Sequence, residues 1–397
     1  MRNQTVLISG ASIAGPALAY WLHHYGFTVT VVERAPALRP GGQAVDFKGA
    51  THLAVLERMG ILDEVRARRT GTTDVAFVDE HERELAFLSG DFTGGDIEIL
   101  RGDLAEVIYR RTEQHCEYVF GDTVTALTDT ADGVRVEFEH AAPRTFDLVL
   151  GADGIHSRVR KLAFGPEAEF VRHLGYYYCV AGASPWSDAD RPRERARGVA
   201  YNSPGKLAID GGSKAQQLYM FASAPLAYSR EDTAAQRRII EQTYAGLGWH
   251  VPRMLAELAD FDDIYLDSIS QVRMKGAYTR GRVALVGDSA YGNTLGGFGT
   301  GLAVVGAYVL AGELALADGD HVTAFAAYDR IMKRYAKIAG NSNAGPFLAP
   351  KTALGIGVRN RFLGSRAFSL MLKYGDKAAN DIDLIDYPAR VAVAETP

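Results

Sequence analysis

The stretch TVLISGASIAG, residues 5–15, runs directly into PALAYWL, residues 16–22. It starts with β-branched and apolar residues, continues with a glycine and several small residues, and then shows apolar residues at helical spacing. This order predicts a strand, a tight turn and a helix. A second strand is expected at residues 28–32, ending on Glu33. The chain therefore opens with a βαβ unit.

The turn of this unit has the features of a dinucleotide-binding site. Gly10 allows the sharp bend, Ser12 keeps the middle position of a GxGxxG-like pattern small, and Gly15 lets the helix pack close to the sheet. Free backbone N–H groups and the positive helix end would face a pyrophosphate, and Glu33 can accept hydrogen bonds from a ribose. The alternatives are an ordinary buried βαβ unit and a secretory signal, which the interrupting glycines disfavour.

Composition limits the class of protein. A chain of 397 residues with 47% hydrophobic content can form two or three domains. The net charge of −5 and the pI near 6.1 give no sign of a nucleic-acid or membrane partner. Cys116 and Cys179 are far apart in sequence and fit two buried thiols in a reducing cytoplasm, and the histidines form no metal-binding pattern. We expect a cytoplasmic protein without a metal.

Two later segments repeat the theme of a strand followed by small residues and a helix. GADGIHSRVR, residues 151–160, follows an apolar strand and could hold an anion or a ribose. RVALVGD, residues 282–288, predicts a buried strand that ends on a carboxylate, before GGFGTG at 296–301 and an apolar helix at 302–316. Arg101 begins another predicted helix, where a cation is unfavourable unless an anion lies nearby. It is a candidate phosphate or flavin contact, with a solvated surface arginine as the alternative.

The middle of the chain has a different character. Short apolar runs predict a largely antiparallel sheet, with strands at 176–180, 199–201, 206–209 and 218–222. The charged, proline-containing stretch 187–198 predicts a surface loop. Helices are expected at 234–244 and 252–258. We interpret the stretch from residue 171 to residue 272 as a substrate domain inserted into the first one. Further helices are expected at 322–339 and 367–373, after this domain.

Three elements in fixed order, GASIAG, GADGIHSRVR, and GDSAYG with GGFGTG, resemble the single-component flavoprotein monooxygenases of the aromatic-hydroxylase type. That family includes para-hydroxybenzoate hydroxylase, polyketide hydroxylases and tetracycline-inactivating monooxygenases. GGQAVDFKG, residues 41–49, looks closest to the tetracycline-inactivating branch. The resemblance implies an α/β fold: a Rossmann-like FAD-binding domain, an inserted, mostly antiparallel β-sheet substrate domain, and C-terminal helices. The expected boundaries are 1–74, 100–168 and 276–340 for the first domain, 75–99 and 169–275 for the second, and 341–397 for the C-terminal segment.

The resemblance also implies the residues that bind FAD. Those expected at the pyrophosphate, the adenosine, the ribityl chain and the flavin ring are Gly10, Ser12, Ile13, Ala14, Gly15, Glu33, Arg34, Arg101, Asp153, Gly154, Gly287, Asp288, Gly297 and Gly299. Arg39 resembles a position linked with NADPH. Leu295 stands near a position where the family usually has proline, so the loop around the flavin is expected to differ.

The resulting hypothesis is a monooxygenase. NADPH or NADH delivers hydride to FAD, dioxygen adds, and a flavin hydroperoxide transfers one oxygen atom to a bulky aromatic or polyketide-type molecule, in biosynthesis or in antibiotic inactivation. No catalytic side chain is assigned. Tyr177, Tyr201 and Phe221 are candidate substrate contacts, with core packing as the alternative. A dehydrogenase that does not use oxygen, and a non-catalytic flavin-binding protein, remain open; a halogenase is disfavoured because no WxWxIP segment is present. We expect a monomer or a weak homodimer.

Overall fold

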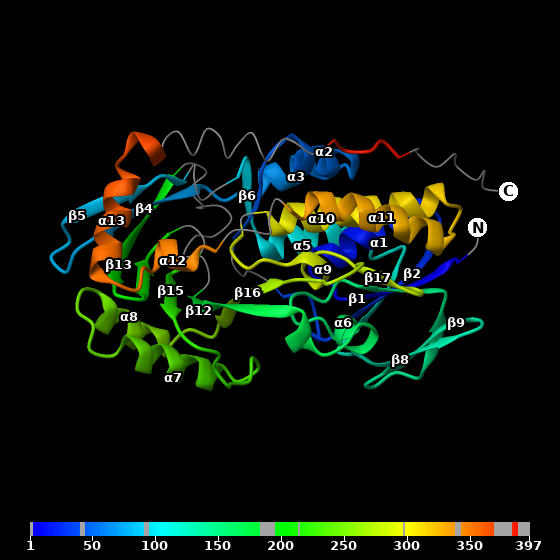
Figure 1. Ribbon diagram of the computed structural model, residues 1–397, viewed down its shortest axis with the longest axis horizontal. Helices are drawn as coiled ribbons and strands as arrows, with labels where there is room; N and C mark the ends of the chain where they lie inside the picture. The colour runs from blue at the N-terminus through cyan, green and yellow to red at the C-terminus, as the bar shows by residue number, and fades with distance from the viewer. Residues whose placement is uncertain are drawn as a thin grey trace.

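The computed structural model describes residues 3–39, 44–90, 95–182, 195–212, 215–296, 298–337, 343–368 and 383–387. Two large sheets organise it, each with helices on its faces (Figure 1). The first has six strands in the spatial order β17 (Thr279–Arg280), β18 (Val283–Leu285), β11 (Leu148–Gly151), β1 (Thr5–Ser9), β2 (Thr28–Glu33) and β7 (Glu117–Phe120). All its pairings are parallel except that of β17 with β18.

The second sheet has seven strands. Their spatial order is β16 (Ile264–Val272), β12 (Val171–Ala181), β15 (Gln217–Ala222), β14 (Lys206–Asp210), β13 (Arg195–Ser203), β4 (Thr72–Val78) and β5 (Glu84–Leu88). Every pairing is antiparallel except that of β13 with β4. Two small sheets join β10 (Arg144–Phe146), β9 (Gly133–Phe138) and β8 (Val124–Thr130), and β3 (Ala44–Phe47) with β6 (Ile97–Leu100). The predicted α/β fold with a mostly antiparallel second sheet is confirmed.

The helices follow the sheets in chain order. They are α1 (Ala14–His24), α2 (Ala50–Arg58), α3 (Leu62–Ala67), α5 (Arg101–Arg110), α6 (Arg158–Ala163), the 3-10 turn η1 (Glu167–Glu169), α7 (Thr233–Tyr244), α8 (Val251–Leu258), α9 (Asp288–Tyr291), α10 (Gly299–Leu316), α11 (His321–Tyr335), α12 (Gly345–Leu348) and α13 (Ala353–Leu363). In Figure 1, α7 and α8 lie on one side of the seven-stranded sheet, and α12 and α13 on the other.

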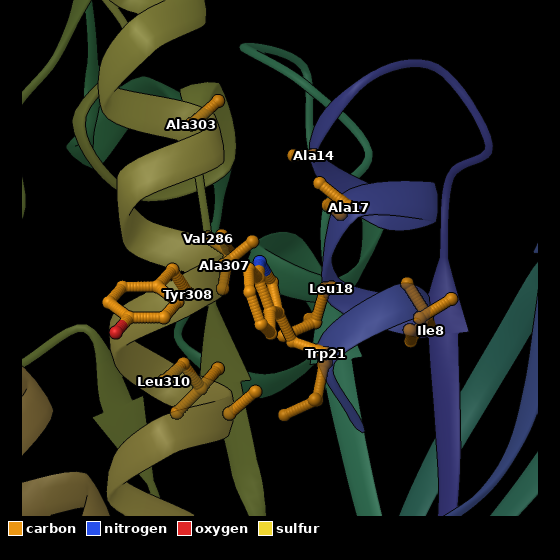
Figure 2. Packing of buried hydrophobic residues seen from close by; sticks show 14 of the residues in the cluster. Ile8, Ala14, Ala17, Leu18, Trp21, Val286, Ala303, Ala307, Tyr308 and Leu310 are labelled. Atoms are coloured by element: carbon orange, nitrogen blue, oxygen red, sulfur yellow. The ribbon is translucent and has the colours of Figure 1, made fainter. Parts of the chain in front are cut away.

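The core of the first sheet explains why α10 is apolar on all sides. α10 packs against α1, α2 and α11, so it has almost no face left for solvent. Figure 2 shows Trp21 of α1 lying between the two helices, close to Ala307 and Tyr308 of α10. The rings of Trp21 and Tyr308 meet edge to face at 4.8 Å. Within the described residues α10 alone is long and apolar enough to cross a membrane, but 72% of it is buried inside the protein, which is typical of a core helix.

Alternation along the strands divides the second sheet into two faces. One face carries Tyr177, Cys179 and Phe221, which form a core with α7 and α8. The other carries Tyr178 and Met220, which form a core with residues of α12 and α13. A strand has a period of two, so neighbouring tyrosines of β12 necessarily point to opposite faces.

Several predicted elements differ from the structure. The predicted loop 187–198 is wrong at its end, because β13 already begins at Arg195, where pairing with β4 extends the strand; residues 187–194 lie outside the described part. The predictions did not include β7 or α3, which are too short to show a clear apolar period. The helix at 322–339 is confirmed over His321–Tyr335, and most of the helix predicted at 367–373 lies outside the described residues. The domain boundaries stay predictions.

Candidate functional site

The turn after β1 has room only for glycine at two positions. Gly10 has a φ of +106°, and a Cβ there would lie 2.5 Å from the carbonyl oxygen of Ala152. A Cβ on Gly15 would lie 1.8 Å from the carbonyl oxygen of Gly10. Because these two residues have no side chains, the start of α1 can pack closely against the end of β1 and the turn that follows it.

The starts of α1 and α10 come together at Gly287. A Cβ on Gly287 would lie 3.2 Å from the Cβ atoms of both Ala14 and Ala303. Neither helix has a side-chain cap: Ile13 precedes α1 and Phe298 precedes α10. Two positive helix ends with uncapped N–H groups are thus held close to one place, which suits an anionic ligand.

Glu33 lies beside this turn, at the end of β2. Its Oε2 accepts the N–H of Ala11 and its Oε1 accepts the N–H of Ala35, both at 2.8 Å. The carboxylate therefore stabilises the loop around the turn. Each oxygen keeps a second lone pair, so a ribose hydroxyl can still donate to it.

Arg101 and Asp288 complete the site from two other elements. The Nε of Arg101, the first residue of α5, donates to the Oγ of Ser12 at 3.0 Å. Burial raises the pKa of Asp288, and the Arg101 guanidinium acts in the opposite direction. Among the described residues no group donates a hydrogen bond to the Asp288 carboxylate, although it is half-buried. A half-buried carboxylate can accept hydrogen bonds from a ligand, and a ribityl chain, which carries several hydroxyls, could donate them.

In the turn after β11, a side chain of the turn itself accepts the hydrogen bonds of the N–H groups at the start of the helix. Asp153 accepts hydrogen bonds from the N–H groups of Arg158 and Val159, at 2.7 and 3.0 Å, and from the hydroxyl of Ser157. Burial raises the pKa of Asp153, and these donors act against that effect. Gly154 has a φ of +81° and open space around its Cα. Asp153 therefore holds the start of α6, and a contact of this turn with a cofactor stays a prediction.

The comparisons with known proteins agree with this geometry. The family model described as FAD binding domain matches residues 3–321. A flavin-dependent monooxygenase from an unknown prokaryotic organism is 34% identical over 410 residues, which cover 97% of this chain and 99% of that protein. The chain belongs to the single-component FAD-dependent monooxygenases. The crystal structure of tetracycline destructase Tet(55) is similar at 33% identity and a TM-score of 0.76, with 97% and 99% of the chains covered. That of Tet(51) is similar at 28% identity and a TM-score of 0.80, with 96% and 99% covered.

The three aromatic residues predicted to contact substrate in this monooxygenase lie in the second sheet. Tyr177 stacks on Phe221 at 5.7 Å, and its hydroxyl accepts the N–H of Leu226 at 2.8 Å. Tyr201 stacks on Trp249 at 5.6 Å and donates to Glu80 at 2.9 Å. Tyr177 and Phe221 belong to the core under α7 and α8, and all three rings are at least 90% buried. The structure shows these three rings packed against their neighbours, and a contact of any of them with substrate stays a prediction.

The opposite face of the sheet holds the aromatic residues that the sequence analysis missed. The rings of Tyr178 and Tyr265 lie 6.0 Å apart, and the hydroxyl of Tyr265 donates to Asp267 at 2.9 Å. Burial raises the pKa of both tyrosines, that of Tyr265 to about 12, while the charge of Arg101 acts to lower both. The charge of Arg101 thus acts on this face of the sheet as well as on Asp288. Alternation in the sequence separates the two faces of the sheet but does not say which one meets a ligand.

Arg34 and Arg39 border a surface pocket of about 440 Å³ that is otherwise lined by residues 35–38 and Glu231. Arg34 also pairs with Glu231 at 2.9 Å. The pocket lies next to Glu33, on the adenosine side of the predicted FAD site.

The loop before α10 explains the departure at Leu295. Leu295 has a φ of +57°, which proline cannot adopt because its ring fixes φ near −65°. Gly297 lies outside the described residues. Gly299 begins α10, and a Cβ there would lie 3.5 Å from Oδ1 of Asp288. The flavin loop of this monooxygenase thus has its own backbone path.

Proposed function

We propose that this monooxygenase hydroxylates a bulky aromatic or polyketide-type small molecule and depends on NADPH and dioxygen. The observation that carries the proposal is the half-buried Asp288 carboxylate, which accepts no hydrogen bond from the described residues, lies within the field of Arg101 and stands where α1 and α10 begin. Bound FAD would supply the redox chemistry there. The chain's own residues would bind the cofactor, orient the substrate and exclude water.

The residues of the site fit FAD in three ways. Gly10, Gly15 and the uncapped start of α1 offer backbone N–H groups to a pyrophosphate. Asp288 offers an acceptor to the ribityl hydroxyls. The start of α10 offers a positive dipole end, which would stabilise negative charge on a reduced flavin.

Substrate and reductant have separate places in this proposal. The substrate would lie between the flavin and the sheet face that carries Tyr178 and Tyr265, where aromatic rings suit a flat molecule. The pocket at Arg39 would hold the pyridine nucleotide, and the Arg39 guanidinium would favour the phosphorylated form, NADPH, while Arg34 pairs with Glu231. The similarity to the tetracycline destructases makes tetracycline the first probe to test. We further propose a cytoplasmic monomer or weak homodimer.

The experiment follows the flavin absorbance of the purified protein. NADPH should bleach it under nitrogen, and air should restore it. With tetracycline present, mass spectrometry should find one atom from labelled dioxygen in the product. Bleaching that air does not reverse would indicate a dehydrogenase, and absence of bleaching would indicate a flavin-binding protein without this activity.

A further inference from the structure

A short segment near the end of the chain, residues 383–387, packs on the helices of the first sheet. It forms no helix or strand, and in Figure 1 it is drawn in red next to α2. Tyr387 is only 6% exposed and belongs to the core of the first sheet. Leu384 and Ile385 pack against the same core. We name residues 383–387 the strap.

The ring of Tyr387 lies on α10 at a position where only glycine leaves room for it. A Cβ on Gly312 would lie 2.3 Å from Cδ2 of Tyr387. The Tyr387 hydroxyl donates to Oε1 of Glu313 at 2.8 Å, and its backbone N–H donates to the hydroxyl of Tyr308 at 3.2 Å. A glycine in the middle of a helix is less stable than alanine. Its presence at position 312 is therefore explained by the contact with the strap.

The backbone of the strap connects three helices. The hydroxyl of Tyr308 on α10 donates to the carbonyl oxygen of Ile385 at 2.9 Å. The hydroxyl of Tyr335 on α11 donates to that of Asp383 at 2.6 Å. Arg58, the last residue of α2, donates both to the Tyr308 hydroxyl and to the carbonyl oxygen of Ile385. The strap therefore holds the end of α2 against the middle of α10.

The other end of α2 contacts the start of α10. His52 is only 2% exposed, and a Cβ on Gly301, in the first turn of α10, would lie 2.1 Å from its Nδ1. The backbone N–H of Lys48 donates to the same nitrogen at 3.3 Å. His52 and Arg58 are separated by about 9 Å of helix. A single short helix thus connects the strap with the uncapped start of α10, which we assign to FAD.

We propose that the strap and FAD stabilise each other's binding, and that α2 transmits this coupling. When the strap lies on Gly312, Arg58 is fixed at Tyr308 and His52 is held against the first turn of α10. When the strap leaves, Arg58 loses a carbonyl acceptor, and α2 can shift along α10. Because the side chains between these points are closely packed, such a shift reaches the start of α10.

The coupling must be the same in both directions. The factor by which the bound strap tightens FAD binding equals the factor by which FAD favours the bound strap. Couplings between distant sites commonly lie between about 5-fold and 150-fold. We expect about 10-fold here, because the strap acts on the site through one helix and does not contact the cofactor.

The first experiment compares two glycine variants of the full-length protein. Gly312→Ala displaces the Tyr387 ring but favours the helical conformation of α10, so the fold should persist. The matched control is Gly357→Ala in α13, where a Cβ would meet nothing within 4 Å. Fluorescence titration of the apoproteins with FAD should give a Kd about 10-fold higher for Gly312→Ala and an unchanged Kd for Gly357→Ala.

The second experiment measures the strap itself by hydrogen exchange of the Tyr387 amide, which is protected only while the strap is bound. In the unaltered protein, FAD should slow this exchange by the same factor of about 10. In Gly312→Ala the exchange should be fast. Tyr387→Phe loses only the donor to Glu313, so its exchange should be about fivefold faster while the Kd for FAD stays nearly unchanged.

Three results would each show that the proposal is wrong. The first is a released strap in Gly312→Ala with a Kd for FAD equal to that of Gly357→Ala. The second is exchange of the Tyr387 amide that FAD does not alter. The third is a protected amide in Gly312→Ala, since the ring would then not need the glycine. Neither experiment uses NADPH, dioxygen or a substrate, so both outcomes are independent of whether the protein oxygenates tetracycline.

Discussion

Two neighbouring strands of the first sheet, β1 and β11, each end in a small-residue turn that leads into a helix. The two turns differ in whether side chains cap the start of that helix. After β1 the helix α1 begins without a side-chain cap. After β11 the helix α6 begins with Ser157, whose hydroxyl accepts the N–H of Arg160 at 2.9 Å, and with Asp153, which accepts two more N–H groups.

The difference in capping indicates which turn has N–H groups available for a ligand. Unsatisfied N–H groups at a helix start need an acceptor. At α6 the chain provides the acceptors itself, whereas at α1 it provides glycines, a hydroxyl and a nearby guanidinium. We infer that the N–H groups of the first turn bind an anionic ligand, and that the second turn mainly stabilises the adjoining strand and helix.

The largest expected effect comes from adding one methyl group to each turn. Gly15→Ala places a Cβ 1.8 Å from the Gly10 carbonyl, so α1 must move away from β1. We expect a loss of about 3 kcal/mol or more in the free energy of unfolding, and loss of FAD. Gly154→Ala meets only backbone strain in open space and should cost about 1 kcal/mol, with FAD retained. Urea unfolding and flavin absorbance of both variants provide the measurement; equal losses would remove the contrast.

Arg101→Ala tests the electrostatic side of the first turn. The variant loses the donor to Ser12 and the cation near Asp288. A charge-assisted contact of this kind contributes about 2 kcal/mol, so the Kd for FAD should rise roughly 30-fold. The control is Arg110→Ala at the other end of α5, where the side chain is 54% exposed and pairs with Glu106. FAD titration followed by fluorescence would show the difference, and an unchanged Kd in Arg101→Ala would place the arginine outside the site.

The sequence predicted the first turn well because its features are local. Gly10, Gly15 and the apolar strands follow from neighbours in the chain, and the structure bears out the strand, turn and helix there. It did not decide between the two faces of the second sheet. Tyr177 and Tyr178 are equivalent in a local pattern, and distant helices cover both, α7 and α8 on one face and α12 and α13 on the other. Which face contacts substrate stays a prediction, because it depends on tertiary packing that no spacing reveals.

Asp288→Asn sharpens the comparison through its pH dependence. Because burial raises the pKa of Asp288, the folded FAD-free protein binds this proton more tightly than the unfolded chain does. Its free energy of unfolding should therefore fall as pH rises from the ordinary aspartate value near 3.9 through the raised one. The variant should lack this slope and be more stable than the unaltered protein at neutral pH. It should also bind FAD several-fold more weakly, with about 1 kcal/mol lost. Thermal unfolding against pH tests the first expectation, and a slope that persists would assign it to another group.

Ser157→Ala gives the smallest effect and bears most directly on the contrast between the turns. The hydroxyl of Ser157 caps α6 and also donates to Asp153, so its loss should cost about 1 kcal/mol in the free energy of unfolding. If the second turn only supports the sheet, the Kd for FAD stays within twofold of the original value, because β1, α1 and α10 are untouched. A large rise in Kd with little loss of stability would mean that the capped turn also holds the cofactor. Asp153 would then have to give up its hydrogen bonds to the start of α6 in order to reach the ligand, and both turns would bind the cofactor although only one of them is capped.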